Sequence, residues 1–127
     1  MKHQIEAKSV SKGDYVMIDD EPCEVRKVNK SAPGKHGHAK FRIQAEGIFD
    51  EKVRNVTKSG EKKLLSPSTE KKVGQIVSKD GDISQVMDMD TYETEEMKMP
   101  EEMDVSEGEE IRFQIIGDRK KILGKND

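Results

Sequence analysis

A single lysine, Lys35, lies in a short segment of proline, glycine and histidine, and its amine is the group in this chain best suited to chemistry. Proline fixes its own φ angle and glycine tolerates angles that other residues avoid, so the segment predicts a tight turn with the lysine at its tip. An amine on a flexible stem is a common modification target, and neighbouring cations favour its neutral, nucleophilic form. The residues expected to present Lys35 are Pro33, Gly34, His36, Gly37 and His38.

The sequence on both sides of this turn is basic, and no aspartate or glutamate occurs from Val25 to Ala45. A slim basic hairpin suits a narrow, negatively charged space, and RNA is the polyanion that such a space suggests. The aromatic residues are few and there is no tryptophan, which disfavours a general RNA-binding barrel that works by base stacking. The residues expected to contact RNA are Arg26, Lys27, Lys30, Lys40 and Arg42.

Metal binding and nucleophilic catalysis are weaker interpretations of the same residues. His36 and His38 are spaced as a pair, but a structural zinc site needs four ligands and a catalytic one about three. The other candidates, His3 and Cys23, have no ligand-like spacing, so we expect no metal site. Cys23 falls on the apolar face of a strand pattern, which predicts a small core residue rather than a catalytic thiolate.

Charge divides the chain into two halves. Residues 1–66 hold 14 Lys and Arg against 10 Asp and Glu, a net charge of +4, whereas residues 67–127 hold 9 against 16, a net charge of −7. Only the first half is therefore expected to face a polyanion, while the second half is expected to be repelled by phosphate or to face a basic protein.

Alternating polar and apolar residues predict an all-β chain. Ala39 to Ala45 alternates as a half-buried strand with a basic outer face, and a phase shift near Arg26 predicts a β-bulge. Asp80-Gly81 lies between two apolar runs and predicts a hairpin, and Asp19 to Pro22 predicts a turn. The acidic stretch from Pro100 to Glu110 is expected to be a loop or a short helix, and the residues from Gly124 to Asp127 are expected to form a frayed tail.

A proline-marked polar segment coincides with the change of charge, and it predicts a domain boundary. We expect two small β-barrels, residues 1–66 and residues 71–127, joined by a hinge over residues 67–70. The one cysteine excludes an intrachain disulfide and fits a reducing compartment. With no signal peptide and no apolar run of the roughly 20 residues that a membrane span needs, a cytoplasmic location without membrane contact is predicted.

The run Gly34-Lys35-His36-Gly37-His38-Ala39-Lys40 resembles the hypusine loop of the translation factor 5A family, the archaeal and eukaryotic counterpart of bacterial elongation factor P. Gly13 to Ile18, Gly47 to Asp50 and Val86 to Thr94 resemble other landmarks of the family, and Pro33 is typical of its archaeal members. The resemblance implies an SH3-like N-terminal barrel that carries the loop over residues 30–40, followed by an acidic OB-fold barrel.

The resemblance also implies a covalent modification. Deoxyhypusine synthase would transfer an aminobutyl group from spermidine to the Lys35 amine, using NAD, to give deoxyhypusine or, after hydroxylation, hypusine. No bound cofactor is expected. The chain would bind the large ribosomal subunit beside the P-site peptidyl-tRNA and promote peptide-bond formation at stalled sites such as consecutive prolines. The ribosome would supply the chemistry, so the chain is expected to be no enzyme, and it is expected to be a monomer.

Two other functions remain open at this point. A ribosome-independent RNA-binding or RNA-chaperone protein would use the same basic face and would be indifferent to modification of Lys35. A small nuclease that uses His36 and His38 is a third and weaker hypothesis.

Overall fold

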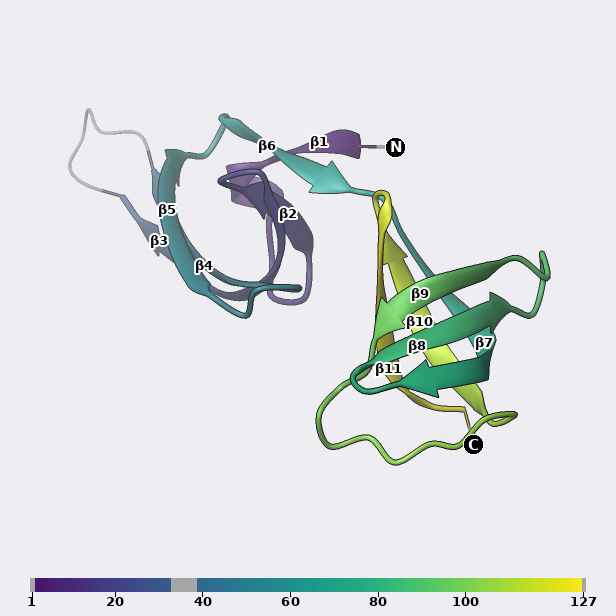
Figure 1. Cartoon of the computed structure of the whole chain (residues 1–127). Coiled ribbons are helices and arrows are strands. Elements are labelled where there is room, and N and C mark those ends of the chain that lie inside the picture. The colour runs from purple at the N-terminus through teal and green to yellow at the C-terminus, as the bar shows by residue number, and fades with distance from the viewer. Residues whose placement is uncertain (1, 33–38, 127) are drawn as a thin grey trace. The chain divides into compact units, whose positions relative to one another are not determined.

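The computed structural model describes residues 2–32 and 39–126, which form two compact units, Met1–Ser68 and Thr69–Asp127 (Figure 1). These are called the N-terminal unit and the C-terminal unit below. Apart from one short 3₁₀ helix, η1 (Ala7–Ser9), the regular structure of the described residues is all strand. The strands are β1 (Lys2–Glu6), β2 (Tyr15–Ile18), β3 (Glu21–Ser31), β4 (Lys40–Gly47), β5 (Val53–Ser59), β6 (Lys63–Pro67), β7 (Thr69–Asp80), β8 (Ile83–Asp88), β9 (Thr94–Lys98), β10 (Glu110–Ile116) and β11 (Arg119–Lys125).

The N-terminal unit curls a four-stranded meander, β2-β3-β4-β5, around a core and adds the pair β1-β6. Phe41, Ile43 and Ala45 point inward from β4, which confirms the predicted half-buried strand. The register of β3 on β4 shifts between Val25 and Lys27, so the predicted bulge is confirmed. The core consists of Ala7, Val10, Val16, Ile18, Cys23, Val25, Phe41, Ile43, Ala45 and Leu64.

The C-terminal unit is one five-stranded antiparallel sheet in the order β11-β10-β7-β8-β9. Its two edge strands approach each other, and an ion pair between Lys120 and Glu95 joins them, so the sheet curls toward a closed barrel. The predicted hairpin is confirmed, with Gly81 at a φ of +64° in the turn between β7 and β8. The core consists of Ile76, Val86, Met97, Met99, Val105, Ile111, Phe113 and Ile122. Two small β-barrels, an SH3-like one followed by an OB-fold, are the fold class that the sequence predicts, and this prediction is confirmed.

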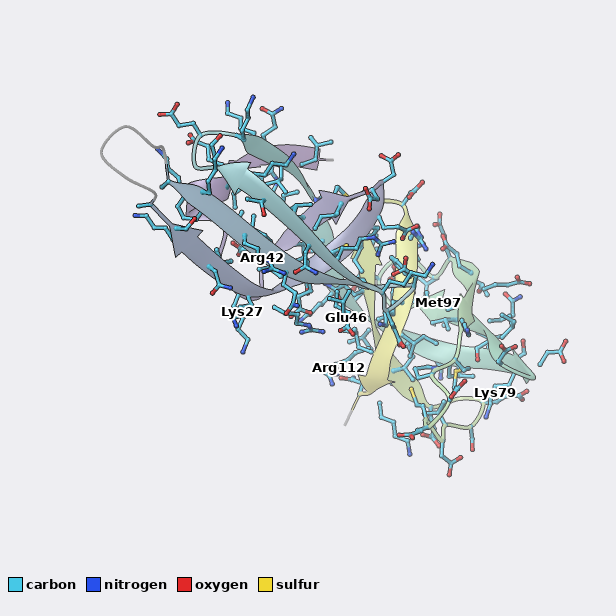
Figure 2. All side chains as sticks on the ribbon, turned by 90° about the vertical axis from the view of Figure 1, so that its left-hand side faces the viewer. Lys27, Arg42, Glu46, Lys79, Met97 and Arg112 are labelled. Carbon is cyan, nitrogen blue, oxygen red and sulfur yellow. The ribbon has the colours of Figure 1, made fainter. Side chains whose placement is uncertain are left out.

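The acidic segment between β9 and β10 is a loop and not a helix in this structure. Lys79, labelled in Figure 2, donates a hydrogen bond from its Nζ to the Val105 carbonyl oxygen at 2.6 Å, and Val105 itself is buried. The buried side chains of Met99 and Val105 and the hydrogen bond from Lys79 therefore help to fix the path of this otherwise polar loop.

Two local expectations need correction. Only Asp19 and Asp20 form the turn after β2, both at positive φ, and Glu21 and Pro22 already belong to β3. The tail is not frayed at Gly124, because β11 continues to Lys125 and the Asn126 N–H donates to the Glu110 carbonyl oxygen at 3.1 Å. In the segment 67–70, where a hinge is predicted, only Ser68 separates β6 from β7.

Candidate functional site

The strands β3 and β4 carry the segment with the predicted modification site. Their ladder ends at the pair Ser31↔Lys40, so residues 32–39 connect the two strands. Lys35 and the residues expected to present it, Pro33, Gly34, His36, Gly37 and His38, lie outside the described residues. The described residues therefore give the geometry of the base of this connection, where β3 and β5 end and β4 begins.

The outer face of these strands carries a cationic and amide-rich patch. Asn29 pairs with Arg42, Lys27 with Gln44, and Gln44 with Asn55, so the strands β3, β4 and β5 bring these side chains together. They line a shallow hollow of about 150 Å³, and Figure 2 shows Lys27 and Arg42 on neighbouring strands. Amides and cations are the groups that contact phosphate and sugar in nucleic-acid complexes. The structure thus brings together two of the five residues that the sequence assigns to RNA contact.

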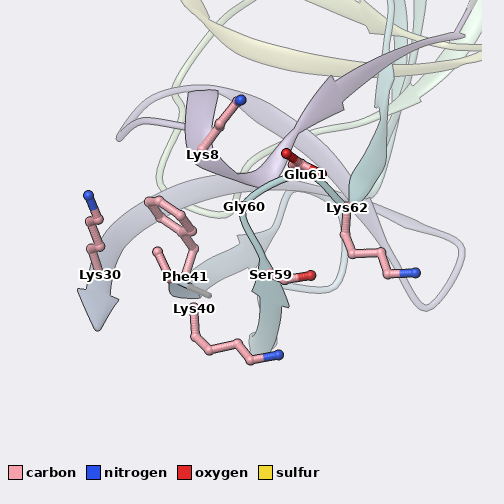
Figure 3. Close-up of a pocket in the computed structure, with 9 residues that line it drawn as sticks. Lys8, Lys30, Lys40, Phe41, Ser59, Gly60, Glu61 and Lys62 are labelled. Carbon is pink, nitrogen blue, oxygen red and sulfur yellow. The ribbon is translucent and has the colours of Figure 1, made fainter. Parts of the chain in front are cut away.

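A larger hollow, of about 670 Å³, lies beside the first residues of β4 (Figure 3). Phe41 forms part of its wall, and the Lys30 Nζ lies 6.0 Å from the centre of the Phe41 ring, within reach of a cation–π contact. We call this feature the lysine hollow. Its lining residues are Lys8, Lys30, Ala39, Lys40, Phe41, Ser59, Gly60, Glu61 and Lys62.

Backbone hydrogen bonds fix the shape of the lysine hollow. The Lys8 N–H donates to the Gly60 oxygen at 3.1 Å, and the Gly60 N–H donates to the Ala39 oxygen at 3.2 Å. These bonds tie η1, the β5–β6 turn and the start of β4 to one another. A Cβ atom at Gly60 would lie 3.1 Å from Phe41 Cε2 and 3.3 Å from Lys8 Cβ, so this close approach favours glycine.

The lysine hollow has a surplus of positive charge. Four lysines line it against one acid, Glu61. Lys8 forms an ion pair with Glu6 at 3.4 Å, whereas within the described part of the chain no ion pair joins Lys30, Lys40 or Lys62 to an acid. Cations that form no ion pair with an acid are available to an anionic ligand.

Arg26 is placed differently from the other four predicted RNA contacts. Its guanidinium donates hydrogen bonds to Glu46 at 2.7 Å and to Glu24 at 3.1 Å, and the bond to the Glu46 carboxylate raises the pKa of Arg26. The bulge in β3 brings it to these two acids, so its charge is already compensated. Lys8 and Lys62, in contrast, are site residues that the sequence analysis missed. The pairing of η1 with the β5–β6 turn places them there, and no local pattern predicts that pairing.

Cys23 is fully buried in the N-terminal core, as predicted. Burial raises the pKa of its thiol, and the Sγ–H donates to the Glu21 carbonyl oxygen at 3.3 Å. A neutral, enclosed thiol is a packing group and not a nucleophile.

Within residues 2–32 and 39–126, no group of three or more histidine, cysteine, aspartate and glutamate side chains could hold a metal ion. No helix in the same part of the chain is long and apolar enough to cross a membrane.

Two small β-barrels in tandem, the first with a cationic hollow at the end of its hairpin, define a two-barrel protein of the kind found among translation factors. A model of the family "Translation initiation factor 5A-like, N-terminal" matches residues 2–61. The chain belongs to the translation initiation factor 5A family. The factor of Haloarcula marismortui is 41% identical over 95% of this chain and 96% of its own length, and that of Archaeoglobus fulgidus is 44% identical over 94% and 96%.

Solved structures agree with this assignment. A structure named as eukaryotic translation initiation factor 5A from Methanococcus jannaschii superposes with a TM-score of 0.92 at 34% identity, over 98% of this chain and 95% of that one. A family protein from Naegleria fowleri has a TM-score of 0.79 at 24% identity, which supports the fold alone.

Proposed function

We propose that this chain is a translation factor that binds the large ribosomal subunit beside the P-site peptidyl-tRNA and promotes peptide-bond formation at stalled sites such as consecutive prolines. The active group would be Lys35, modified to deoxyhypusine or hypusine by deoxyhypusine synthase with the aminobutyl group of spermidine. The observation that carries the proposal is the lysine hollow, which lies at the end of the hairpin that bears Lys35.

The lysine hollow supports contact with RNA. RNA backbones carry one negative charge per nucleotide, and cations that are not paired with an acid bind them with release of counterions. Lys30 and Lys40 flank the connection between β3 and β4 directly, so phosphate held there would fix the position of the hairpin. The cationic patch of Lys27 and Arg42 adds a second contact on the same hairpin.

The modification would extend the reach of this hairpin. An aminobutyl group lengthens the Lys35 side chain and adds a second cationic amine, which can meet phosphates in a gap too narrow for folded backbone. Holding the end of the tRNA in place lowers the entropic part of the barrier for a poor substrate. In this mechanism the ribosome supplies the reacting groups, and the factor acts by positioning.

Translation of a message with consecutive prolines, in a reconstituted system with protein from native cells, tests this function. Lys35→Arg keeps a positive charge but cannot accept the aminobutyl group, so we expect loss of the stimulation. The matched control is Lys12→Arg, an exposed lysine in a loop of the same unit, which should stimulate like the unaltered chain. Normal stimulation by Lys35→Arg, or an unmodified Lys35 in the mass of the native loop peptide, would overturn the mechanism.

The second candidate is a ribosome-independent RNA-binding or RNA-chaperone protein, which the two cationic hollows also favour. It predicts salt-sensitive binding to isolated single-stranded RNA that is equal for modified and unmodified protein. Filter binding with both forms distinguishes the two functions, since only the ribosomal one depends on the modification.

A further inference from the structure

Tyr92 lies in the hairpin turn between β8 and β9 and is 71% exposed, the highest value among the large hydrophobic side chains of the described residues. Its φ is +63°, in the left-handed region. That region is costly for a residue with a bulky side chain, and strained residues concentrate where function requires them. Neither the core nor the proposed function accounts for a tyrosine at this position.

The turn is braced so that the strained conformation is fixed. The Tyr92 N–H donates to the Asp88 carbonyl oxygen at 2.7 Å, and the Asp88 N–H donates to the Glu93 oxygen at 2.8 Å. The Asp88 carboxylate accepts hydrogen bonds from the N–H groups of Asp90 and Thr91, at 2.8 and 3.3 Å, and bonds to Lys72 Nζ at 2.5 Å. The backbone at Tyr92 is therefore fixed before any partner arrives, which reduces the entropic cost of ordering the turn on binding.

The N-terminal unit contains a turn with the same backbone pattern. There the Glu51 N–H donates to the Gly47 oxygen at 3.0 Å, the Gly47 N–H donates to the Lys52 oxygen at 2.8 Å, and Glu51 has a φ of +60°. An exposed glutamate at such a position is well hydrated. The backbone pattern thus belongs to this type of turn, while the exposed aromatic ring is specific to the turn at Tyr92.

The charges around Tyr92 are negative. The side chain of Asp90 is 79% exposed, and Glu93, the residue that follows Tyr92 in sequence, is also exposed. Two lysines of the unit are engaged with acids of this turn and of β9, Lys72 with Asp88 and Asp90, and Lys120 with Glu95. Such a surface repels phosphate, so stacking on a nucleobase of RNA is disfavoured.

An exposed tyrosine with an acidic rim fits a cationic protein surface. Tyrosine is enriched among the residues that contribute most to binding between proteins, and the face of its ring attracts lysine and arginine. We propose that Tyr92, with Asp90 and Glu93, is a docking surface for a lysine- and arginine-rich protein segment exposed on the ribosome. This inference rests on the proposed ribosomal function.

The test places the photo-crosslinking residue p-benzoylphenylalanine at position 92 and irradiates the full chain with purified ribosomes of the native cells. The expected result is a crosslink to a protein peptide rich in lysine and arginine. A crosslink to RNA, or no crosslink while the chain co-sediments with ribosomes, overturns the docking surface alone. Failure of the unaltered chain to co-sediment overturns the ribosomal function, and the docking surface with it, so the two failures are distinguishable.

A matched pair of variants provides a second test. Asparagine tolerates the left-handed region, so Tyr92→Asn should fold with an unchanged or higher melting temperature and bind ribosomes about tenfold more weakly. Glu51→Asn makes the corresponding change in the other turn and should leave binding unchanged. Unchanged binding by Tyr92→Asn, or an equal loss in both variants, would contradict the proposal.

Discussion

Lys30, Lys40 and Lys62 line an open hollow in the N-terminal unit, whereas Lys72 and Lys120 in the C-terminal unit are bonded to carboxylates. In the N-terminal unit acids compensate one of the five predicted RNA contacts, Arg26. The net charges of +4 for residues 1–66 and −7 for residues 67–127 therefore describe the difference between the two units incompletely. What distinguishes the two units is which sign of charge remains available at the surface, and this decides which kind of partner each unit can meet.

The two units also have separate cores, each with its own set of buried side chains. Phe113 is the largest fully buried side chain of the C-terminal core and is 1% exposed. Its replacement by alanine should lower the free energy of unfolding of that unit by about 3–5 kcal/mol. Hydrogen exchange should show lost protection in β7–β11 while the amides of β2–β5 stay protected, and equal loss in both units would show that they unfold together. Phe113→Leu, which leaves a smaller void, is the control.

Gly74 tests how tightly the C-terminal sheet is packed. A Cβ atom there would lie 2.6 Å from Val86 Cγ1 and 3.2 Å from the Met87 carbonyl oxygen, so Gly74→Ala should cost about 1–3 kcal/mol. Gly124→Ala in β11 is the matched control, because the nearest atom to its Cβ is Arg112 Nη2 at 3.8 Å. Urea denaturation of the two variants measures the difference, and equal stabilities would mean that β7 and β8 can move apart.

Charge reversal in the lysine hollow tests the surface of the N-terminal unit. Lys30→Glu combined with Lys40→Glu should weaken ribosome association about tenfold and reduce the slope of log affinity against log salt by about two. The control, Lys98→Glu with Lys125→Glu, makes the same change of charge at exposed positions of the C-terminal unit. Co-sedimentation at several salt concentrations measures both. If the two pairs of variants lose the same affinity, the comparison between the units fails.

Removing the charge of Asp88 is expected to change stability the least of these substitutions. Burial alone would raise its pKa, but the Lys72 ammonium and the N–H groups of Asp90 and Thr91 outweigh it and lower the pKa below the ordinary value of 3.8. A lowered folded-state pKa stabilises the fold above the unfolded-state pKa, and the stabilisation is lost as pH falls through the folded value. Asp88→Asn should therefore cost about 1 kcal/mol at neutral pH and less near pH 2. Denaturation at both pH values checks this, and a cost that is undiminished in acid would assign the effect to packing.

The strands that could be predicted from the sequence are those in which polar and apolar residues alternate regularly. Phe41, Ile43 and Ala45 alternate with polar residues over the whole of β4, and the phase shift at Arg26 gave the position of the bulge. The strands β1, β6 and β11 gave no such signal, since lysine and glutamate interrupt their apolar residues and their pairing partners stabilise them. The strands β1 and β6 depend on their pairing with each other, which is distant in sequence, whereas β11 depends on its pairing with the neighbouring strand β10.

The residues of the candidate site also divide into those that the local sequence groups together and those that only tertiary contacts bring together. Lys27, Lys30, Lys40 and Arg42 lie on one hairpin, and the local sequence was sufficient to group them. Lys8 and Lys62 join Lys30 and Lys40 only because η1 packs on the β5–β6 turn. The compensation of Arg26 by Glu46 requires the register between β3 and β4. Side chains that meet through tertiary contacts cannot be assigned from spacing alone.

The pairing of β1 with β6 joins Lys2 to Pro67 and Glu6 to Lys63, the two ends of the N-terminal unit. During synthesis on a ribosome the meander β2–β5 can form as soon as neighbouring strands emerge, because its pairings are local in sequence. The first strand, however, must wait until Pro67 has left the exit tunnel before its partner is available. The barrel that carries the lysine hollow thus closes only when its first strand finds the last one, and it can do so before the C-terminal unit has emerged from the tunnel.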